Sequence, residues 1–250
     1  MHLSAVNSIN WARVMAQVVY YVTACAHLGG GPVSFAVPTG NFGNIYAGWV
    51  ASRMGLPIDQ LVIGSNRNDI LTRTFASGRM VAEGVVPSLS PSMDIQVSSN
   101  LERLLFEVLG RDGAATADLL TRFRAEGAVE LPAEQFRALS ERFVAARCDD
   151  DETLAVMKDV HAAHGILVDP HTAVGIHAAR TASRRGPAVP MVVLATAHPA
   201  KFPDAVVAAT GVHPELPLHL ADLLERPERF TVLADDVGAV RSFIRARLAS

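Results

Sequence analysis

The stretch that decides the fold is Val33-Ser34-Phe35-Ala36-Val37-Pro38-Thr39-Gly40-Asn41-Phe42-Gly43-Asn44. It opens with a short β-prone run, turns at Pro-Thr-Gly, and is followed by a helical pattern from Ile45 to Met54. After the break at Gly55-Leu56-Pro57, the run Leu61-Val62-Ile63-Gly64 is typical of a second buried strand. Strand, turn, helix and strand in this order predict a βαβ unit, and therefore a parallel sheet in an α/β fold.

A helix is predicted before this unit, from Ser8 to Leu28. Apolar and small side chains recur there at the spacing of one helix face. Asn7 or Ser8 has the side chain of an N-cap, and Gly29-Gly30-Gly31 ends the pattern. The helix therefore leads directly into the first strand.

The rest of the chain is predicted to be helical over a long stretch before further strands appear. From about Asn100 to Arg147 the periodicity is helical, with no convincing strand, and the acidic run Asp149–Glu152 suits the start of another helix. Further on, the pattern predicts a short strand at Ile166–Val168, a helix at Thr172–Ser183, a strand at Met191–Ala195 and a helix at Lys201–Thr210. We therefore expect an α/β part with the glycine turn at 1–98, a helical insertion at 99–150, the remainder of the α/β domain at 151–212, and a C-terminal tail with a helix at 213–250.

Composition narrows the function classes. Half of the 250 residues are hydrophobic, which excludes general disorder, and the net charge of −3 provides no basic field for nucleic acid or anionic lipid. No apolar run has the length of a membrane span, and the N-terminal segment is not a signal peptide. Two cysteines cannot build a disulfide scaffold. We therefore expect a cytoplasmic globular protein.

The turn from Gly40 to Asn44 is the strongest candidate site. Its two glycines allow backbone N–H groups to converge at the start of a helix, where they can bind a phosphate without a lysine or arginine. A tight strand-to-helix turn with an asparagine cap is an equally good interpretation of the turn alone. No Gly-Lys-Ser/Thr follows, so it is not a Walker loop, and the second strand ends in Gly64-Ser65-Asn66 rather than at an acid, which disfavours a dinucleotide fingerprint.

The histidines do not predict a metal centre. His161, His164, His171 and His177 do not share one helix face, and no cysteine or carboxylate pair completes a tetrahedral set. His171 and His198 stand beside prolines in turn contexts, which is typical of structural histidines. We therefore predict no metal site.

Six motifs in one order identify a resemblance that no single motif would. They are Asn7-Ser8-Ile9-Asn10-Trp11-Ala12-Arg13, Val37 to Asn44, Ser65-Asn66-Arg67-Asn68-Asp69-Ile70, Pro91-Ser92-Met93-Asp94-Ile95, Asp169-Pro170-His171-Thr172-Ala173, and Thr196-Ala197-His198-Pro199-Ala200-Lys201-Phe202. From about Leu3 to Thr210 the chain resembles the C-terminal part of threonine synthases, which are pyridoxal-phosphate enzymes of fold type II. The resemblance implies an α/β, parallel-sheet core of that fold, incomplete at its N-terminus.

The resemblance also implies roles for particular residues. The cofactor would be pyridoxal 5'-phosphate, its phosphate held by the main chain of Gly40, Asn41, Phe42, Gly43 and Asn44, and its pyridine nitrogen facing Thr196. Ser8 and Arg13 would bind the substrate's phosphate, with help from Asn10. From the residues alone, Ser8 as an N-cap, Arg13 as a solvated or ion-paired side chain and Thr196 as a strand-end hydroxyl remain open alternatives.

The lysine that binds the cofactor in threonine synthases lies in an N-terminal Phe-Lys-Asp segment that does not occur here. The sequence has two lysines, Lys158 and Lys201, and neither stands at that family position. We therefore expect no catalytic lysine in this chain, and an isolated chain that is inactive and binds the cofactor weakly at most. We also expect one face of the parallel sheet to lack its cover, which favours self-association or pairing with an N-terminal half chain.

The resemblance implies a carbon–oxygen lyase acting on phosphates, which converts O-phospho-L-homoserine and water into L-threonine and phosphate. Two alternatives stay open. One is another fold type II lyase, such as a threonine dehydratase, and the other is a non-catalytic homologue that binds a phosphorylated metabolite at the Gly40 to Asn44 turn.

Overall fold

The computed structural model describes residues 7, 9–182 and 189–249. The chain divides into two compact units, Met1–Pro214 and Glu215–Ser250. The second unit contains the short 3₁₀ turn η3 (Leu218–Leu220) and the helix α10 (Val237–Ala249). The first unit carries the sheet and everything described below.

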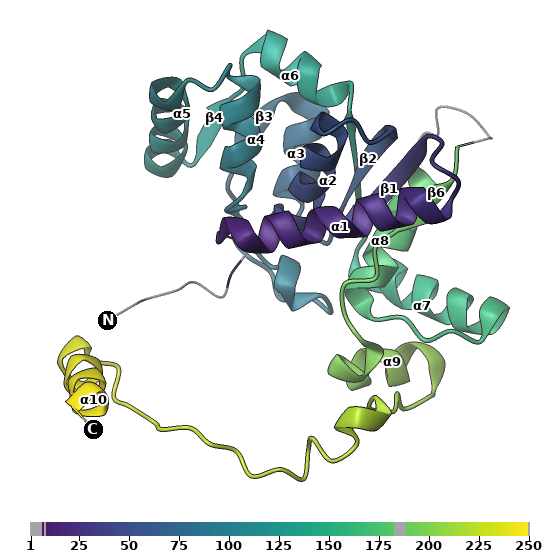
Figure 1. Ribbon diagram of the computed structural model, residues 1–250, viewed down its shortest axis with the longest axis vertical. Helices are drawn as coiled ribbons and strands as arrows, with labels where there is room; N and C mark the ends of the chain where they lie inside the picture. Colours follow the sequence, from purple (N-terminus) through teal and green to yellow (C-terminus); the bar gives the residue numbers. More distant parts are fainter. Residues whose placement is uncertain (1–6, 8, 183–188, 250) are drawn as a thin grey trace. The chain divides into compact units, whose positions relative to one another are not determined.

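A four-stranded parallel sheet in the order β5-β2-β1-β6 forms the centre of the first unit (Figure 1). Its strands are β1 (Val33–Pro38), β2 (Ile58–Ser65), β5 (Phe143–Arg147) and β6 (Met191–Val193). The helix α2 (Gly43–Arg53) joins β1 to β2, whose register places Ala36 opposite Val62. The predicted βαβ unit is therefore confirmed.

Both faces of the sheet are covered by helices. Phe35 and Leu61 belong to a core shared with α1 (Trp11–His27), α2 and α3 (Ile70–Ser77), while Ala36 and Val62 belong to a core shared with α8 (Pro170–Thr181). This alternation follows from the two-residue period of a strand. The expectation that one face of the sheet lacks its cover is wrong, because α8 fills the face opposite α1 and α2.

The remaining elements lie outside the central sheet. A second sheet of two antiparallel strands pairs β3 (Arg79–Val81) with β4 (Ala128–Glu130). The other helical segments are η1 (Pro91–Met93), α4 (Leu101–Val108), α5 (Gly113–Glu126), α6 (Ala133–Ser140), α7 (Asp150–His164), η2 (Pro199–Lys201) and α9 (Pro203–Thr210). None of the helices in the described residues is long and apolar enough to cross a membrane.

Two strand predictions fail. The stretch 99–150, predicted to be helical without a strand, contains β4 and β5, and β5 pairs with β2 in the central sheet. A short apolar run such as Phe143–Arg147 carries no periodicity that separates strand from helix. The predicted strand at Ile166–Val168 is an irregular connection between α7 and α8.

Side-chain caps start two of the predicted helices, α1 and α7. Asn10 caps α1 by accepting a hydrogen bond from the N–H of Ala12 at 3.0 Å, so the prediction of Asn7 as N-cap is wrong, and Ser8 lies outside the described residues. Asp149 and Glu152 form a capping box at α7, which confirms the predicted helix start there.

Candidate functional site

A cavity of about 630 Å³ opens at the carboxyl ends of β1 and β6. The chain runs outward from β1 through β2 to β5 and then returns to β6 on the other side of β1. Ligands in open parallel sheets bind where the strand order reverses in this way. The cavity therefore lies where the topology predicts a ligand, and its volume suits a molecule of cofactor size.

One wall of the cavity is the glycine turn, Gly40 to Asn44, which follows the carboxyl end of β1. Phe42 has a left-handed backbone, with φ of 62°, immediately before α2 begins at Gly43. A Cβ atom on Gly40 would lie 2.5 Å from the carbonyl oxygen of Ser92, so only glycine fits there. A strained non-glycine residue and an obligatory glycine in one turn are features typical of ligand-binding loops.

Hydrogen bonds turn the carbonyl groups of this turn away from the cavity. The carbonyl oxygen of Gly40 accepts from the Ser98 hydroxyl at 2.7 Å, and that of Asn41 accepts from the Asn100 side chain at 2.9 Å and backbone N–H at 3.1 Å. The first N–H groups of α2 have no carbonyl within the helix to bind. The turn therefore offers the cavity backbone donors and the positive end of a helix, which suit a phosphate.

The segment around η1 is fixed against the turn by a polar network. Asp94 accepts hydrogen bonds from the side-chain amides of Asn66 at 2.7 Å and Asn68 at 2.9 Å, and from the Ser88 hydroxyl at 2.6 Å. Asn66 and Asn68 are buried. The network connects two of the sequence motifs, because it ties the η1 segment, in which Ser92 lies beside Gly40, to the loop after β2.

A buried tyrosine connects α1 to the start of α2. The Tyr21 hydroxyl donates to the carbonyl oxygen of Asn44 at 2.8 Å, and burial raises the pKa of Tyr21 well above its ordinary value. A Cβ atom on Gly48 would lie 2.6 Å from the Tyr21 ring, so the small residue permits this close approach. The contact fixes the position of α1 relative to the phosphate turn.

The opposite wall contains a buried aspartate–histidine pair at the start of α8. Asp169 accepts from Nδ1 of His171 at 3.0 Å and from the Thr172 hydroxyl, and both Asp169 and His171 are buried. Burial raises the pKa of Asp169, but the hydrogen bonds from His171 and Thr172 outweigh it and hold the pKa below its ordinary value. Nε2 of His171 is buried and has no hydrogen-bond partner among the described residues.

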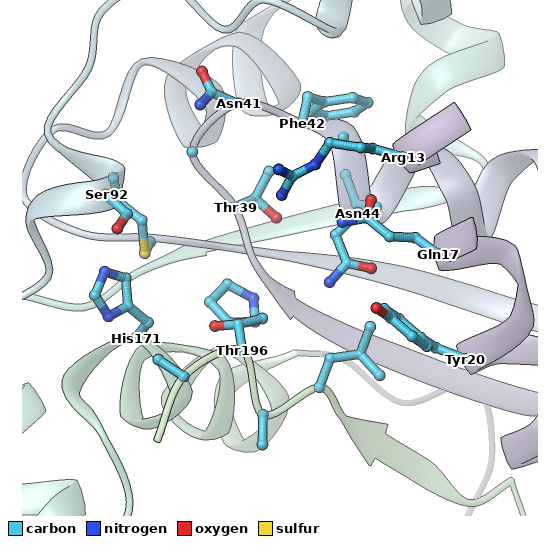
Figure 2. Close-up of a pocket in the computed structure, with 18 of the residues that line it drawn as sticks. Arg13, Gln17, Tyr20, Thr39, Asn41, Phe42, Asn44, Ser92, His171 and Thr196 are labelled. Atoms are coloured by element: carbon cyan, nitrogen blue, oxygen red, sulfur yellow. The ribbon is translucent and has the colours of Figure 1, made fainter. Parts of the chain in front are cut away.

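Most of the predicted site residues meet at the cavity, which is lined by Arg13, Gly40, Asn41, Phe42, Gly43, Asn44 and Thr196 (Figure 2). Asn10 does not line it and caps α1 instead. Ser8 lies outside the described residues. Sequence reasoning assigned no role to several lining residues, among them Gln17, Tyr20, Ser92, His171 and Lys201.

One group of potential metal ligands escaped the sequence reasoning. Cys148, Glu152 and His177 bring their ligand atoms within 4.8 Å of one another. Burial, opposed by the hydrogen bond to Thr153 and reinforced by nearby carboxylates, raises the pKa of the Cys148 thiol to about 12. The thiol is therefore protonated at neutral pH and is a poor metal ligand in this state.

Comparisons with known proteins agree on one family. A family model described as "Threonine synthase, C-terminal" matches residues 172–244. The threonine synthase of Pseudomonas aeruginosa is 51% identical over an alignment of 245 residues, which covers 97% of this chain and 52% of that protein. The threonine synthase of Corynebacterium glutamicum is 41% identical over 258 residues, covering 99% of this chain and 53% of that protein. The chain spans about half the length of the curated relatives it matches.

Solved structures give the same result for the fold. The PLP-bound threonine synthase of Brucella melitensis superposes with a TM-score of 0.93 at 54% identity, covering 98% of this chain and 53% of that one. The yeast threonine synthase superposes with a TM-score of 0.89 at 34% identity, covering 98% of this chain and 54% of that one. In sequence and in fold, the chain corresponds to the C-terminal half of the threonine synthases.

Proposed function

We propose that this chain is the cofactor-phosphate-binding and substrate-binding part of a threonine synthase, which converts O-phospho-L-homoserine and water into L-threonine and phosphate. The observation that carries the proposal is the cavity at the carboxyl ends of β1 and β6, which is lined by both the turn from Gly40 to Asn44 and Thr196. The chain's similarity to threonine synthases supports the same function.

The residues of the cavity fit pyridoxal 5'-phosphate. Backbone N–H groups of the turn would hold its phosphate, and the Thr196 hydroxyl would face its pyridine nitrogen. Two of the lining residues, Gln17 and His171, each carry a buried polar atom, Oε1 and Nε2, that has no hydrogen-bond partner among the described residues. When bound, this cofactor supplies an electron sink for reactions at the carbons of an amino acid.

At the substrate end, Arg13 would bind the phosphate of the substrate through its guanidinium, a group suited to bidentate phosphate binding. Ser8 and Asn10 stay predictions of the family resemblance for the same task. Holding the phosphate at one end orients the amino-acid end towards the wall formed by Thr39 and Thr196, and this orientation is the chain's own contribution to the reaction.

We infer that the catalytic lysine is not in this chain. Lys158 is exposed on α7, and Lys201 lines the cavity but lies in the segment after β6, a different family position. These 250 residues on their own would then bind small molecules without turnover until an N-terminal half is supplied. The outer side of α1 supports a protein partner, because Trp11, Met15 and Val19 are about half exposed there.

We also place this function in the cytoplasm. Cys25 and Cys148 are both buried free thiols, as expected in a reducing compartment.

The test is phosphate release from O-phospho-L-homoserine in the presence of pyridoxal phosphate. We expect none from the chain alone, and release of phosphate with formation of threonine after mixing with the N-terminal half of the Pseudomonas aeruginosa threonine synthase. Turnover by the chain alone would refute the absence of the catalytic lysine.

The same mixture discriminates the alternatives. Deamination of threonine without phosphate release would favour a dehydratase. Binding of O-phospho-L-homoserine with no reaction in a mixture that forms a stable complex would favour a non-catalytic binder. Borohydride reduction followed by mass spectrometry should place the pyridoxyl label on the added N-terminal half and not on Lys201.

A further inference from the structure

The wall of the cavity that follows β6 carries a basic side chain without an assigned role. Lys201 is the last residue of η2, stands five residues after Thr196, and lines the cavity together with Thr196 and Phe202. The chain has one other lysine, Lys158, which is exposed on α7 and does not line the cavity. The family resemblance gives Thr196 a task but leaves Lys201 unexplained.

Ring contacts place the amino group of Lys201 beside the cavity. Its Nζ atom lies 5.9 Å from the centre of the Phe202 ring, and the Phe202 ring lies 4.8 Å from the ring of His171. Phe202 and His171 both line the cavity, and Figure 2 shows His171 on the opposite side of it from Arg13 and Tyr20 of α1. Lys201 is exposed, so a ligand in the cavity can reach its charge.

The lining has basic side chains but no acidic ones. The described residues that line the cavity include two strong bases, Arg13 and Lys201, and no aspartate or glutamate. Asp169 contacts His171, but its carboxylate already accepts hydrogen bonds from His171 and Thr172. A positively charged cavity attracts anions and raises their local concentration. The lining therefore favours a ligand with several negative charges.

We propose that Lys201 is an anion-binding residue, whose ammonium group binds a phosphate monoester in the cavity from the side opposite α1. The inference rests on the proposed function, which brings two phosphate monoesters to the cavity, one on the cofactor and one on O-phospho-L-homoserine. Each carries about 1.5 to 2 negative charges at neutral pH. A lysine suits this task because its ammonium group is a compact charge on a flexible stem, which binds phosphate without a fixed geometry.

Coulomb's law gives the size of the effect. A unit positive charge about 6 Å from a doubly charged phosphate changes the binding constant about ten-fold in the dielectric of water. Salt screens this attraction, because the Debye length falls from about 30 Å at 0.01 M salt to about 3 Å at 1 M. Loss of the Lys201 charge should therefore weaken phosphate binding at low salt and have little effect at high salt.

The test compares ligand pairs that differ only in the phosphate. Pyridoxine 5'-phosphate is paired with pyridoxine, and O-phospho-L-homoserine with L-homoserine. The first pair has an alcohol where the cofactor has an aldehyde, so neither member reacts with a lysine. Backbone amide shifts of the isotopically labelled chain give the dissociation constants of the wild type, Lys201→Met, Lys201→Arg and the control Lys158→Met. Circular dichroism verifies that each variant is folded.

At about 0.01 M salt we expect Lys201→Met to weaken at least one phosphorylated ligand about ten-fold and to leave pyridoxine and L-homoserine unchanged. The pair that responds identifies the phosphate that Lys201 binds. Lys201→Arg keeps the charge and should bind like the wild type, as should Lys158→Met. At about 1 M salt the difference between Lys201→Met and the wild type should nearly disappear.

Equal weakening of a phosphorylated ligand and its unphosphorylated partner by Lys201→Met would mean that the lysine only supports the structure of the wall. That result, unchanged affinities for all four ligands, or a Lys201→Arg variant as weak as Lys201→Met would overturn the inference while the proposed function stands. A wild-type chain that binds neither phosphorylated ligand would overturn both.

Discussion

Replacing Gly40 by alanine tests whether the phosphate turn and the η1 segment are packed as tightly as the structure indicates. The new Cβ would lie 2.5 Å from the carbonyl oxygen of Ser92 and 3.2 Å from Cα of Met93. An ordinary contact needs about 3.4 Å, so the backbone at Ser92 must retreat by about 0.9 Å. The backbone at Ser92 cannot move freely, because Asp94, two residues further along, accepts hydrogen bonds from the side chains of Asn66 and Asn68. Overpacking of this kind costs about 1–3 kcal/mol of unfolding free energy.

The assay is urea unfolding followed by tryptophan fluorescence, with Gly113→Ala as the matched control. Gly113 is the first residue of α5 and has no atom within 4 Å of an added Cβ, so alanine there should leave the unfolding free energy unchanged or raise it by up to about 1 kcal/mol. Gly40→Ala should also weaken binding of pyridoxal phosphate. The packing argument would be refuted if the unfolding free energy of Gly40→Ala lay within about 0.5 kcal/mol of the wild-type value, which is the range of an ordinary surface substitution.

Three further predictions concern buried groups around the site. Tyr21→Phe removes the hydrogen bond to Asn44 and should lower the unfolding free energy by about 0.5–1.5 kcal/mol in urea unfolding, and an unchanged midpoint would contradict the link between α1 and α2. Hydrogen bonds hold the pKa of Asp169 below its ordinary value in the folded protein, so the ionised carboxylate stabilises the fold. This stabilisation is complete above the unfolded-state pKa of about 3.9 and is lost as the pH falls through the lower folded-state pKa. The stability difference between wild type and Asp169→Asn should therefore shrink on acidification, and a difference that grows would contradict the assignment. With its pKa raised to about 12, the Cys148 thiol should resist maleimide at pH 8 in the folded protein and react after unfolding, as mass spectrometry of the labelled peptide would show.

The sequence predicted the local part of the site better than its surroundings. The run from Val33 to Asn44 combines a β-prone segment, a turn and a helix within a few residues, so the βαβ unit and the phosphate turn follow from local rules. Arg13 and Thr196 were placed by family resemblance, and the structure brings both to the cavity.

The missed features depend on contacts between distant segments. The strand β5 is recognisable only once β2 lies beside it, and the cover on the second sheet face comes from α8, far along the chain. His171 has the sequence context of a structural histidine, and only its unpartnered Nε2 beside the cavity reveals more. The helical spacing of Arg13 and Gln17 was the one local signal that would have identified a further site residue.

The most direct measurement is a titration of the isotopically labelled chain with pyridoxal phosphate and with pyridoxal, observed through backbone amide chemical shifts. If the start of α2 holds a phosphate, pyridoxal phosphate should shift the amides from Asn41 to Asn44 strongly, pyridoxal should leave them almost unchanged, and Thr196 should respond to both ligands. Identical responses of the turn to the two ligands, or shifts that lie outside the cavity at the carboxyl ends of β1 and β6, would contradict a phosphate site at this turn.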